Sequence, residues 1–133
     1  MFYNKSSFFF LALLLVGLFL AACSNSPQSA QKKIDKIAQD MKAELPKMLD
    51  RDTKLVNVYT KKLELVSEYE LVNYESTETV NQRIINDIEL YLKNQVCPGI
   101  KKEMLSRGIS SRYIYKDKDR QVIVDRLLSP GDC

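Results

Sequence analysis

The sequence predicts an α+β fold: one small domain with the element order α-β-β-α-β-β, in which two helices cover one face of a four-stranded antiparallel sheet. The main observation is that the spacing of apolar residues changes from a helical period to a strand period twice along the chain. A second observation is the pair Cys97 and Cys133, which can tie the second helix to the last residues. Because each helix and the sheet bury only one face, both helices are expected over a single core.

The first 22 residues have the composition of a secretory signal peptide. Lys5 is the only charged residue before an uncharged apolar run over residues 8–22. As a helix this run would be only about 22 Å long, whereas the hydrocarbon core of a bilayer is about 30 Å thick. Residues 1–22 are therefore predicted to be cleaved rather than to stay as a transmembrane helix.

The run ends in Leu20-Ala21-Ala22-Cys23, which resembles the lipobox of bacterial lipoproteins. The resemblance implies that Cys23 carries a diacylglyceryl group and, after cleavage, an acylated amino group. Several acyl chains on one residue anchor a protein durably, because each buried methylene contributes about 0.8 kcal/mol. Ser24 at the next position implies sorting to the outer membrane. The alternatives are an ordinary signal peptide with a chance cysteine, or an uncleaved anchor.

Residues 23–31 are polar and contain Pro27, so they are predicted to form a lipidated tether, and the folded periplasmic domain is expected over residues 32–133. The first predicted helix follows, and Pro46 ends it because the residue before a proline avoids the helical region. Its apolar residues recur at helical spacing along one stripe: Ile34, Ile37, Ala38, Met41 and Leu45.

Two strands joined by a hairpin are predicted between residues 50 and 74. Leu55, Val56, Val58 and Tyr59 form the first run, and the turn is expected at Lys61-Lys62. In the second run apolar residues and glutamates alternate, as in a strand with one buried face. The predicted buried face holds Leu63, Leu65, Ser67, Tyr69 and Leu71, and the opposite face holds Glu64, Glu68 and Glu70.

A second helix is predicted to start near Ser76 or Thr79 and to be interrupted by Pro98-Gly99. Cys97 lies at its end, and in an exported domain it is expected to form a disulfide with Cys133. The last two strands are predicted over residues 109–115 and 121–127. Asp117 and Asp119 between them are expected in a solvated turn rather than a Ca²⁺ site, because the lysines beside them do not suit calcium.

The residues needed for common catalytic chemistry are missing. The chain has no histidine and only four glycines, which removes the usual general base and any glycine-rich phosphate loop. Composition alone leaves a two-carboxylate hydrolase open. We expect no enzyme activity, no cofactor and no metal. Charges of both signs are mixed, with a formal net charge of +3, so nucleic acid is not an expected partner.

The arrangement of short motifs resembles that of the β-type pilotins of type II secretion systems. The motifs are Ala38-Gln39-Asp40-Met41, Leu45-Pro46, the run from Met104 to Ile109, the Tyr113–Asp117 hairpin strand, and the two bracketing cysteines. The resemblance implies a non-catalytic binding module that holds the C-terminal segment of a secretin and carries it to the outer membrane by its own lipid anchor.

Such a role requires an exposed apolar groove that could take an amphipathic helix. The residues predicted to line this groove are Ile34, Ile37, Met41, Leu63, Leu65 and Tyr69. Each could instead belong to the core. Two other functions stay open: a small structural or receptor-masking lipoprotein of the surface-exclusion type, and an inhibitor of a periplasmic enzyme.

Overall fold

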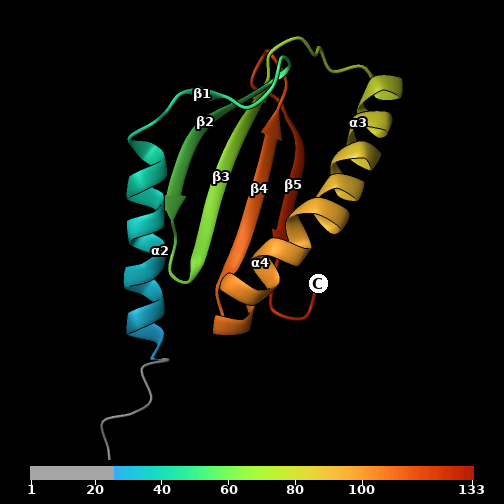
Figure 1. Cartoon of the computed structure of the whole chain (residues 1–133). Helices are drawn as coiled ribbons and strands as arrows, with labels where there is room; N and C mark the ends of the chain where they lie inside the picture. Colours follow the sequence, from blue (N-terminus) through green and yellow to red (C-terminus); the bar gives the residue numbers. More distant parts are fainter. Residues whose placement is uncertain (1–25) are drawn as a thin grey trace, which may run out of the picture.

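The computed structural model describes residues 26–133, which form a five-stranded sheet with helices on one side (Figure 1). In chain order the elements are α2 (Pro27–Lys42), β1 (Lys47–Met48), β2 (Thr53–Thr60), β3 (Glu64–Leu71), α3 (Glu78–Tyr91), a π-helical turn (Leu92–Val96), α4 (Cys97–Glu103), a 3₁₀ turn (Leu105–Arg107), β4 (Ser110–Lys116) and β5 (Val122–Leu128). No helix in this part of the chain has the length and apolar character needed to cross a membrane.

Helix α2 begins earlier than the sequence predicted. Pro27 occupies its first turn, where the missing N–H of proline costs nothing, and the Ser26 side chain caps the helix by accepting from the Ser29 N–H at 3.2 Å. The predicted tether over residues 23–31 is therefore wrong from Pro27 onward. The prediction treats Pro27 as a loop residue, whereas in the structure Pro27 starts a helix.

Both predicted hairpins are present. Strands β2 and β3 are antiparallel, and the turn between them closes through two backbone hydrogen bonds between Lys61 and Glu64, with Lys62 at a φ of 55°. Strands β4 and β5 are likewise antiparallel. The alternation predicted for β3 is confirmed, because Leu65, Ser67, Tyr69 and Leu71 are buried while the glutamates between them are partly exposed.

The predicted four-stranded antiparallel sheet is wrong in two respects. The sheet has the order β1-β2-β3-β4-β5, including the short β1, and its central pair β3–β4 is parallel. Glu64 pairs with Ser110 and Glu70 with Lys116. The helical segment between β3 and β4 returns the chain along the sheet to the end where β3 began, so β4 must run in the same direction as β3.

The core lies on one face of the sheet, as predicted. One cluster joins buried residues of α2, such as Ile34, to those of the strands and of the second helical segment, such as Leu92. Val66 is only 1% exposed but lies outside this cluster, since it projects from the opposite face between Tyr59 and Arg112. The helices therefore all pack on the other side.

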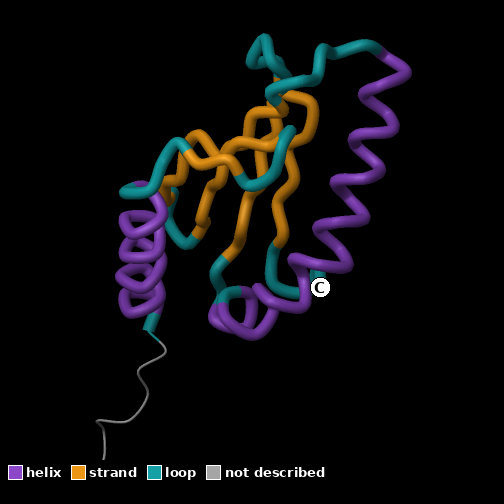
Figure 2. Tube along the Cα trace, turned by 45° about the horizontal axis from the view of Figure 1, so that its top comes forward, coloured by secondary structure: helices purple, strands orange, loops and turns teal. Residues whose placement is uncertain are grey.

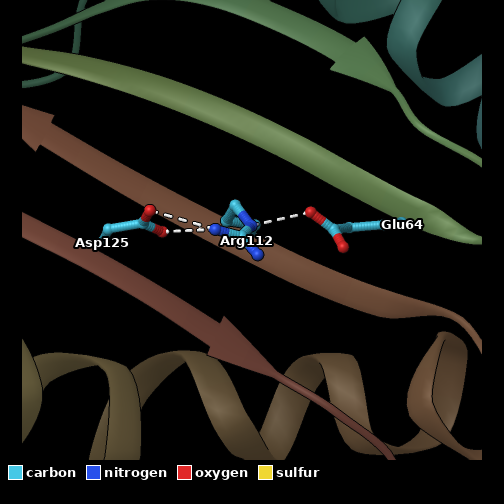
Figure 3. A network of polar contacts seen from close by, with 3 residues as sticks. All are labelled: Glu64, Arg112 and Asp125. Atoms are coloured by element: carbon cyan, nitrogen blue, oxygen red, sulfur yellow. Dashed lines mark hydrogen bonds and ion pairs between the residues drawn. The ribbon is translucent and has the colours of Figure 1, made fainter.

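The helix-free face carries ion pairs between neighbouring strands. Arg112 on β4 donates to Glu64 on β3 at 2.7 Å and to Asp125 on β5 at 2.9 and 3.0 Å (Figure 3). Two further pairs link lysines to glutamates: Lys116–Glu68 at 3.0 Å and Lys54–Glu70 at 3.5 Å. Ion pairs that water reaches contribute little stability, so the main effect of this layer is to keep the face polar.

The second helical segment changes its winding before Pro98. Proline has no N–H to donate to the preceding turn, and the chain passes through the π-helical turn before α4 starts at Cys97. Cys97 is bonded to Cys133 with a Cα–Cα distance of 5.5 Å, so the predicted disulfide is present. It joins the start of α4 to residues that follow β5.

Asp117 is buried, which corrects the solvated turn predicted for it. Its carboxylate accepts from the Ser76 hydroxyl and from the backbone N–H groups of Asp119 at 2.9 Å and Gln121 at 2.8 Å. These bonds, that of Ser76 foremost, lower the pKa of Asp117 below its usual value. Asp117 thus joins the β4–β5 turn to the loop that leads into α3.

We expect Asp117→Asn to lower the free energy of unfolding, because a neutral amide cannot satisfy all three donors. The difference from wild type should be full at neutral pH and shrink below about pH 3.9, the ordinary pKa of aspartate. A group with a lowered folded-state pKa stabilises the fold above its unfolded pKa and loses that contribution as the pH falls through the folded value. Urea unfolding from pH 7 to 2.5 measures this, and a difference independent of pH would contradict it.

We expect Cys97→Ser combined with Cys133→Ser to lower the free energy of unfolding by roughly 2–5 kcal/mol, because the bond restricts the unfolded chain. Urea unfolding with and without reductant measures the effect, and reduced wild type should match the double variant. If the folded, unreduced wild type reacts with a thiol reagent at both cysteines, the disulfide assignment fails.

Candidate functional site

A cleft of about 770 Å³ opens between α3 and the helix-covered face of the sheet. Figures 1 and 2 show α2 and α3 near opposite edges of the sheet, with β3 and β4 between them. The cleft is bounded by the β1–β2 loop, by the centre of β3 and β4, and by one side of α3. Its lining residues are Leu49, Asp50, Arg51, Asp52, Thr53, Tyr69, Leu71, Tyr74, Ile84, Asp87, Ile88, Tyr91, Val96, Tyr113 and Tyr115.

Helix α3 is fixed at both ends. Before it, Ser76 bonds to Asp117 and the Lys118 N–H donates to the Tyr74 carbonyl at 2.9 Å. After it, Leu92 is 1% exposed in the core, and the disulfide at Cys97 follows. Between these points α3 presents Ile84 and Ile88 to the cleft. The helix therefore forms a wall whose position is set at its two ends.

Three tyrosines form the floor of the cleft. Tyr69 on β3 lies opposite Tyr115 on β4 in the parallel pair, and their rings stack with centroids 4.6 Å apart and planes 14° apart. The Tyr113 ring lies parallel to that of Tyr69 at 6.4 Å. Tyr113 pairs across the strands with Ser67, whose small side chain leaves space above the sheet. The floor is thus a set of stacked, largely apolar rings of which only a small part is exposed: Tyr69 is 9% exposed, Tyr113 7% and Tyr115 6%.

Burial raises the pKa of all three floor tyrosines. The pKa of Tyr69 rises to about 12, mainly through burial, and those of Tyr113 and Tyr115 are also raised by burial. Tyr91 on α3 lines the same cleft. These phenols are uncharged at neutral pH and can offer ring surface and neutral hydrogen bonds.

The rim of the cleft combines exposed apolar side chains with carboxylates. Leu49 is 51% exposed and Tyr91 is 53% exposed. The β1–β2 loop beneath Leu49 is held by Asp50, which accepts from the N–H groups of Asp52 and Thr53, both at 2.8 Å. The lining holds one basic side chain, Arg51, and three carboxylates, which belong to Asp50, Asp52 and Asp87. The rim therefore suits a partner with apolar and basic side chains.

The lining combines aromatic rings with carboxylates. Within residues 26–133 no group of three or more histidine, cysteine, aspartate or glutamate side chains is placed to hold a metal ion. The tyrosines have raised pKa values and stay protonated at neutral pH, and the lining contains no histidine or cysteine. A ring-lined cleft with an acidic rim can hold apolar side chains and pair with positive charges.

Of the six residues predicted to line a groove, Tyr69 lies in the cleft. Ile34 and Leu65 are buried in the core, and Ile37, Met41 and Leu63 are half-buried against it on the side of α2. Contact of any of the six with a partner stays a prediction.

The sequence analysis missed the tyrosines contributed by β4 and α3. Tyr113 and Tyr115 repeat at the strand period, and Tyr91 lies at the edge of the apolar face of its helix. This repetition of one residue type was the available signal. Cys23 and the predicted signal peptide lie outside the described residues, so lipidation of Cys23 stays a prediction.

No model of a known protein family matches the sequence, and no curated protein matches it by sequence. Among solved structures, this one is similar to the type 2 secretion pilotin EpsS of Vibrio vulnificus, with a TM-score of 0.60, 13% identity, and coverage of 80% of this chain and 94% of that chain. It is also similar to the type II secretion pilotin AspS of Vibrio cholerae, with a TM-score of 0.54, 18% identity, and the same coverage of 80% and 94%.

A third similar structure is a putative secreted protein of Pseudomonas aeruginosa, with a TM-score of 0.64, 17% identity, and coverage of 85% of this chain and 99% of that chain. At these identities the likeness concerns the fold. The resemblance to type II secretion pilotins predicted from short motifs is thus confirmed for the fold of nearly the whole described domain.

Proposed function

We propose that this chain is a lipid-anchored, pilotin-like binding module that holds a segment of an outer-membrane secretion component, and that it has no catalytic activity. The observation that carries the proposal is the tyrosine-floored cleft, found in a fold shared with two type II secretion pilotins. The motif resemblance implies that the segment is the C-terminal part of a secretin. The lipid on Cys23 would place the complex at the outer membrane, facing the periplasm.

The shape of the cleft suits an amphipathic helix. A helix with its side chains is about 10 Å across, too large to enter whole, but apolar side chains at helical spacing can reach into a groove. A volume of about 770 Å³ accommodates several such side chains over the rings of Tyr69, Tyr113 and Tyr115. Basic residues beside the apolar stripe would meet Asp50, Asp52 and Asp87 at the rim.

Tyr91 offers a sharp test, because it lies on the cleft wall, is 53% exposed and can be truncated without opening the core. Aromatic side chains at the centre of an interface commonly contribute 2 kcal/mol or more, about thirtyfold in affinity. We expect Tyr91→Ala to weaken binding of a peptide with the C-terminal secretin sequence by roughly that factor in calorimetry.

Leu90 provides the matched control for this experiment. It is the preceding residue of α3, is 59% exposed and does not line the cleft. Leu90→Ala should bind the peptide as wild type does. If both variants bind equally well, the cleft is not the binding site. If wild type binds no secretin peptide while a cross-linked pull-down recovers a different outer-membrane protein, the secretin assignment is wrong.

Lipid anchoring has its own test. Cys23→Ala should leave an unprocessed precursor that incorporates no labelled palmitate, because the acylated thiol is lost. Radiolabelling followed by electrophoresis shows both the label and the size of the chain. Normal labelling of this variant would end the lipoprotein assignment and leave the cleft proposal standing.

A further inference from the structure

Five basic side chains gather at one end of the domain. They are exposed, and within residues 26–133 none of them has a carboxylate partner: Lys32, Lys61, Lys62, Lys102 and Arg107. They come from the start of α2, the β2–β3 turn, α4 and the 3₁₀ turn. We define these five residues as the basic end.

Contacts between these elements place them together. Lys33 on α2 pairs with Glu103 at the end of α4 at 3.6 Å. The Ser110 N–H, just after the 3₁₀ turn, donates to the Leu63 carbonyl in the β2–β3 turn at 2.8 Å. Figure 1 shows the same arrangement, with the start of α2, the β2–β3 turn and α4 at the bottom of the view.

Carboxylates at this end offset part of the positive charge. Asp35 accepts from Thr60 at 2.7 Å and from Gln31 at 2.8 Å, and Glu103 faces Lys33. Asp132 accepts from the Ser129 N–H at 2.6 Å. Lys101 donates to a Cys133 oxygen at 3.0 Å and is left out of the basic end for that reason. The five residues of the basic end outnumber these three carboxylates, and the carboxylates that line the cleft come from the β1–β2 loop and α3.

The position of the first helix brings the basic end close to the predicted lipid. Because α2 starts at Pro27, only four residue steps separate it from Cys23. An extended chain covers at most about 3.6 Å per residue, so this link can span no more than about 14 Å. That reach is comparable to the Debye length of about 8–10 Å at physiological salt. Charges beside Ser26 would therefore feel the field of a membrane surface.

We propose that the basic end binds the anionic phospholipid surface of the membrane in which Cys23 is anchored, and so orients the domain with its cleft pointing away from the bilayer. The inference rests on the lipid anchor of the proposed function. The anchor holds the protein at the membrane, whereas the five charges determine which side of the domain faces it. An anionic surface favours this orientation by roughly fivefold for each basic side chain near the headgroups.

The test uses the mature lipidated protein in vesicles of phosphatidylcholine alone or with phosphatidylglycerol. Lysine acetylation rates, mapped by mass spectrometry, report which lysines face the lipid. With phosphatidylglycerol we expect Lys61, Lys62 and Lys102 to react several times more slowly, Lys42 to react at an unchanged rate, and 1 M salt to remove the difference.

Charge reversal supplies the matched control. Lys61→Glu with Lys62→Glu should abolish the protection of Lys102, since losing the two positive charges alone weakens the orientation on the order of thirtyfold and the two added negative charges weaken it further. Lys42→Glu with Arg83→Glu makes the same change in net charge on exposed residues of α2 and α3 and should leave the protection intact.

Equal acetylation rates in the two lipids, or protection that survives the reversal, would overturn the proposal. Protection seen in native membranes but not in phosphatidylglycerol vesicles would assign the basic end to an acidic protein instead. Loss of the lipid anchor gives a different result, because the protein would then not float with phosphatidylcholine vesicles. Binding to phosphatidylglycerol vesicles at low salt would still show whether the basic end contacts anionic lipid.

Discussion

The attachment of α3 at its two ends determines the rest of the site. At one end the buried carboxylate of Asp117 accepts hydrogen bonds from the Ser76 hydroxyl and from two backbone N–H groups. These bonds connect the loop before α3 to the β4–β5 turn. At the other end Leu92 is buried and Cys97 is bonded to Cys133. With both ends held, α3 runs beside the sheet without covering β3 and β4.

The chemistry of the site follows from the residues that line the cleft. The stacked phenol rings are largely buried, which keeps their hydroxyl groups neutral. Charge appears only at the rim, where water screens it. Recognition in such a site depends on the fit of apolar side chains, while the carboxylates favour partners of one sign. The opposite face of the sheet has its charges paired between neighbouring strands and presents no comparable apolar surface.

The elements could be predicted from local patterns, but their long-range arrangement could not. The alternation of Leu65, Tyr69 and Leu71 with glutamates gave the buried face of β3 correctly, and the period after Pro98 gave β4 and β5 within one residue. The direction of β4 relative to β3 depends on where the helical segment ends, which no local pattern encodes. Asp117 was assigned to solvent because an aspartate between lysines usually lies there, and its partner Ser76 is distant in sequence. The cleft beside α3 could not be predicted, because an amphipathic stripe does not reveal whether a neighbour covers it, and the groove predicted on the first helix stays a prediction.

The bond between Cys97 and Cys133 makes part of the site depend on the redox conditions around the chain. It spans 36 residues, and disulfides persist in oxidising compartments whereas the cytoplasm keeps thiols reduced. Helix α2 and strands β1 to β3 precede this loop, β4 and β5 lie within it, and the helical segment that carries α3 reaches its first cysteine. With free thiols, the end of that segment would lose its covalent link to the residues after β5. Under the proposed function, the wall of the cleft would therefore be secured covalently only in an oxidising compartment.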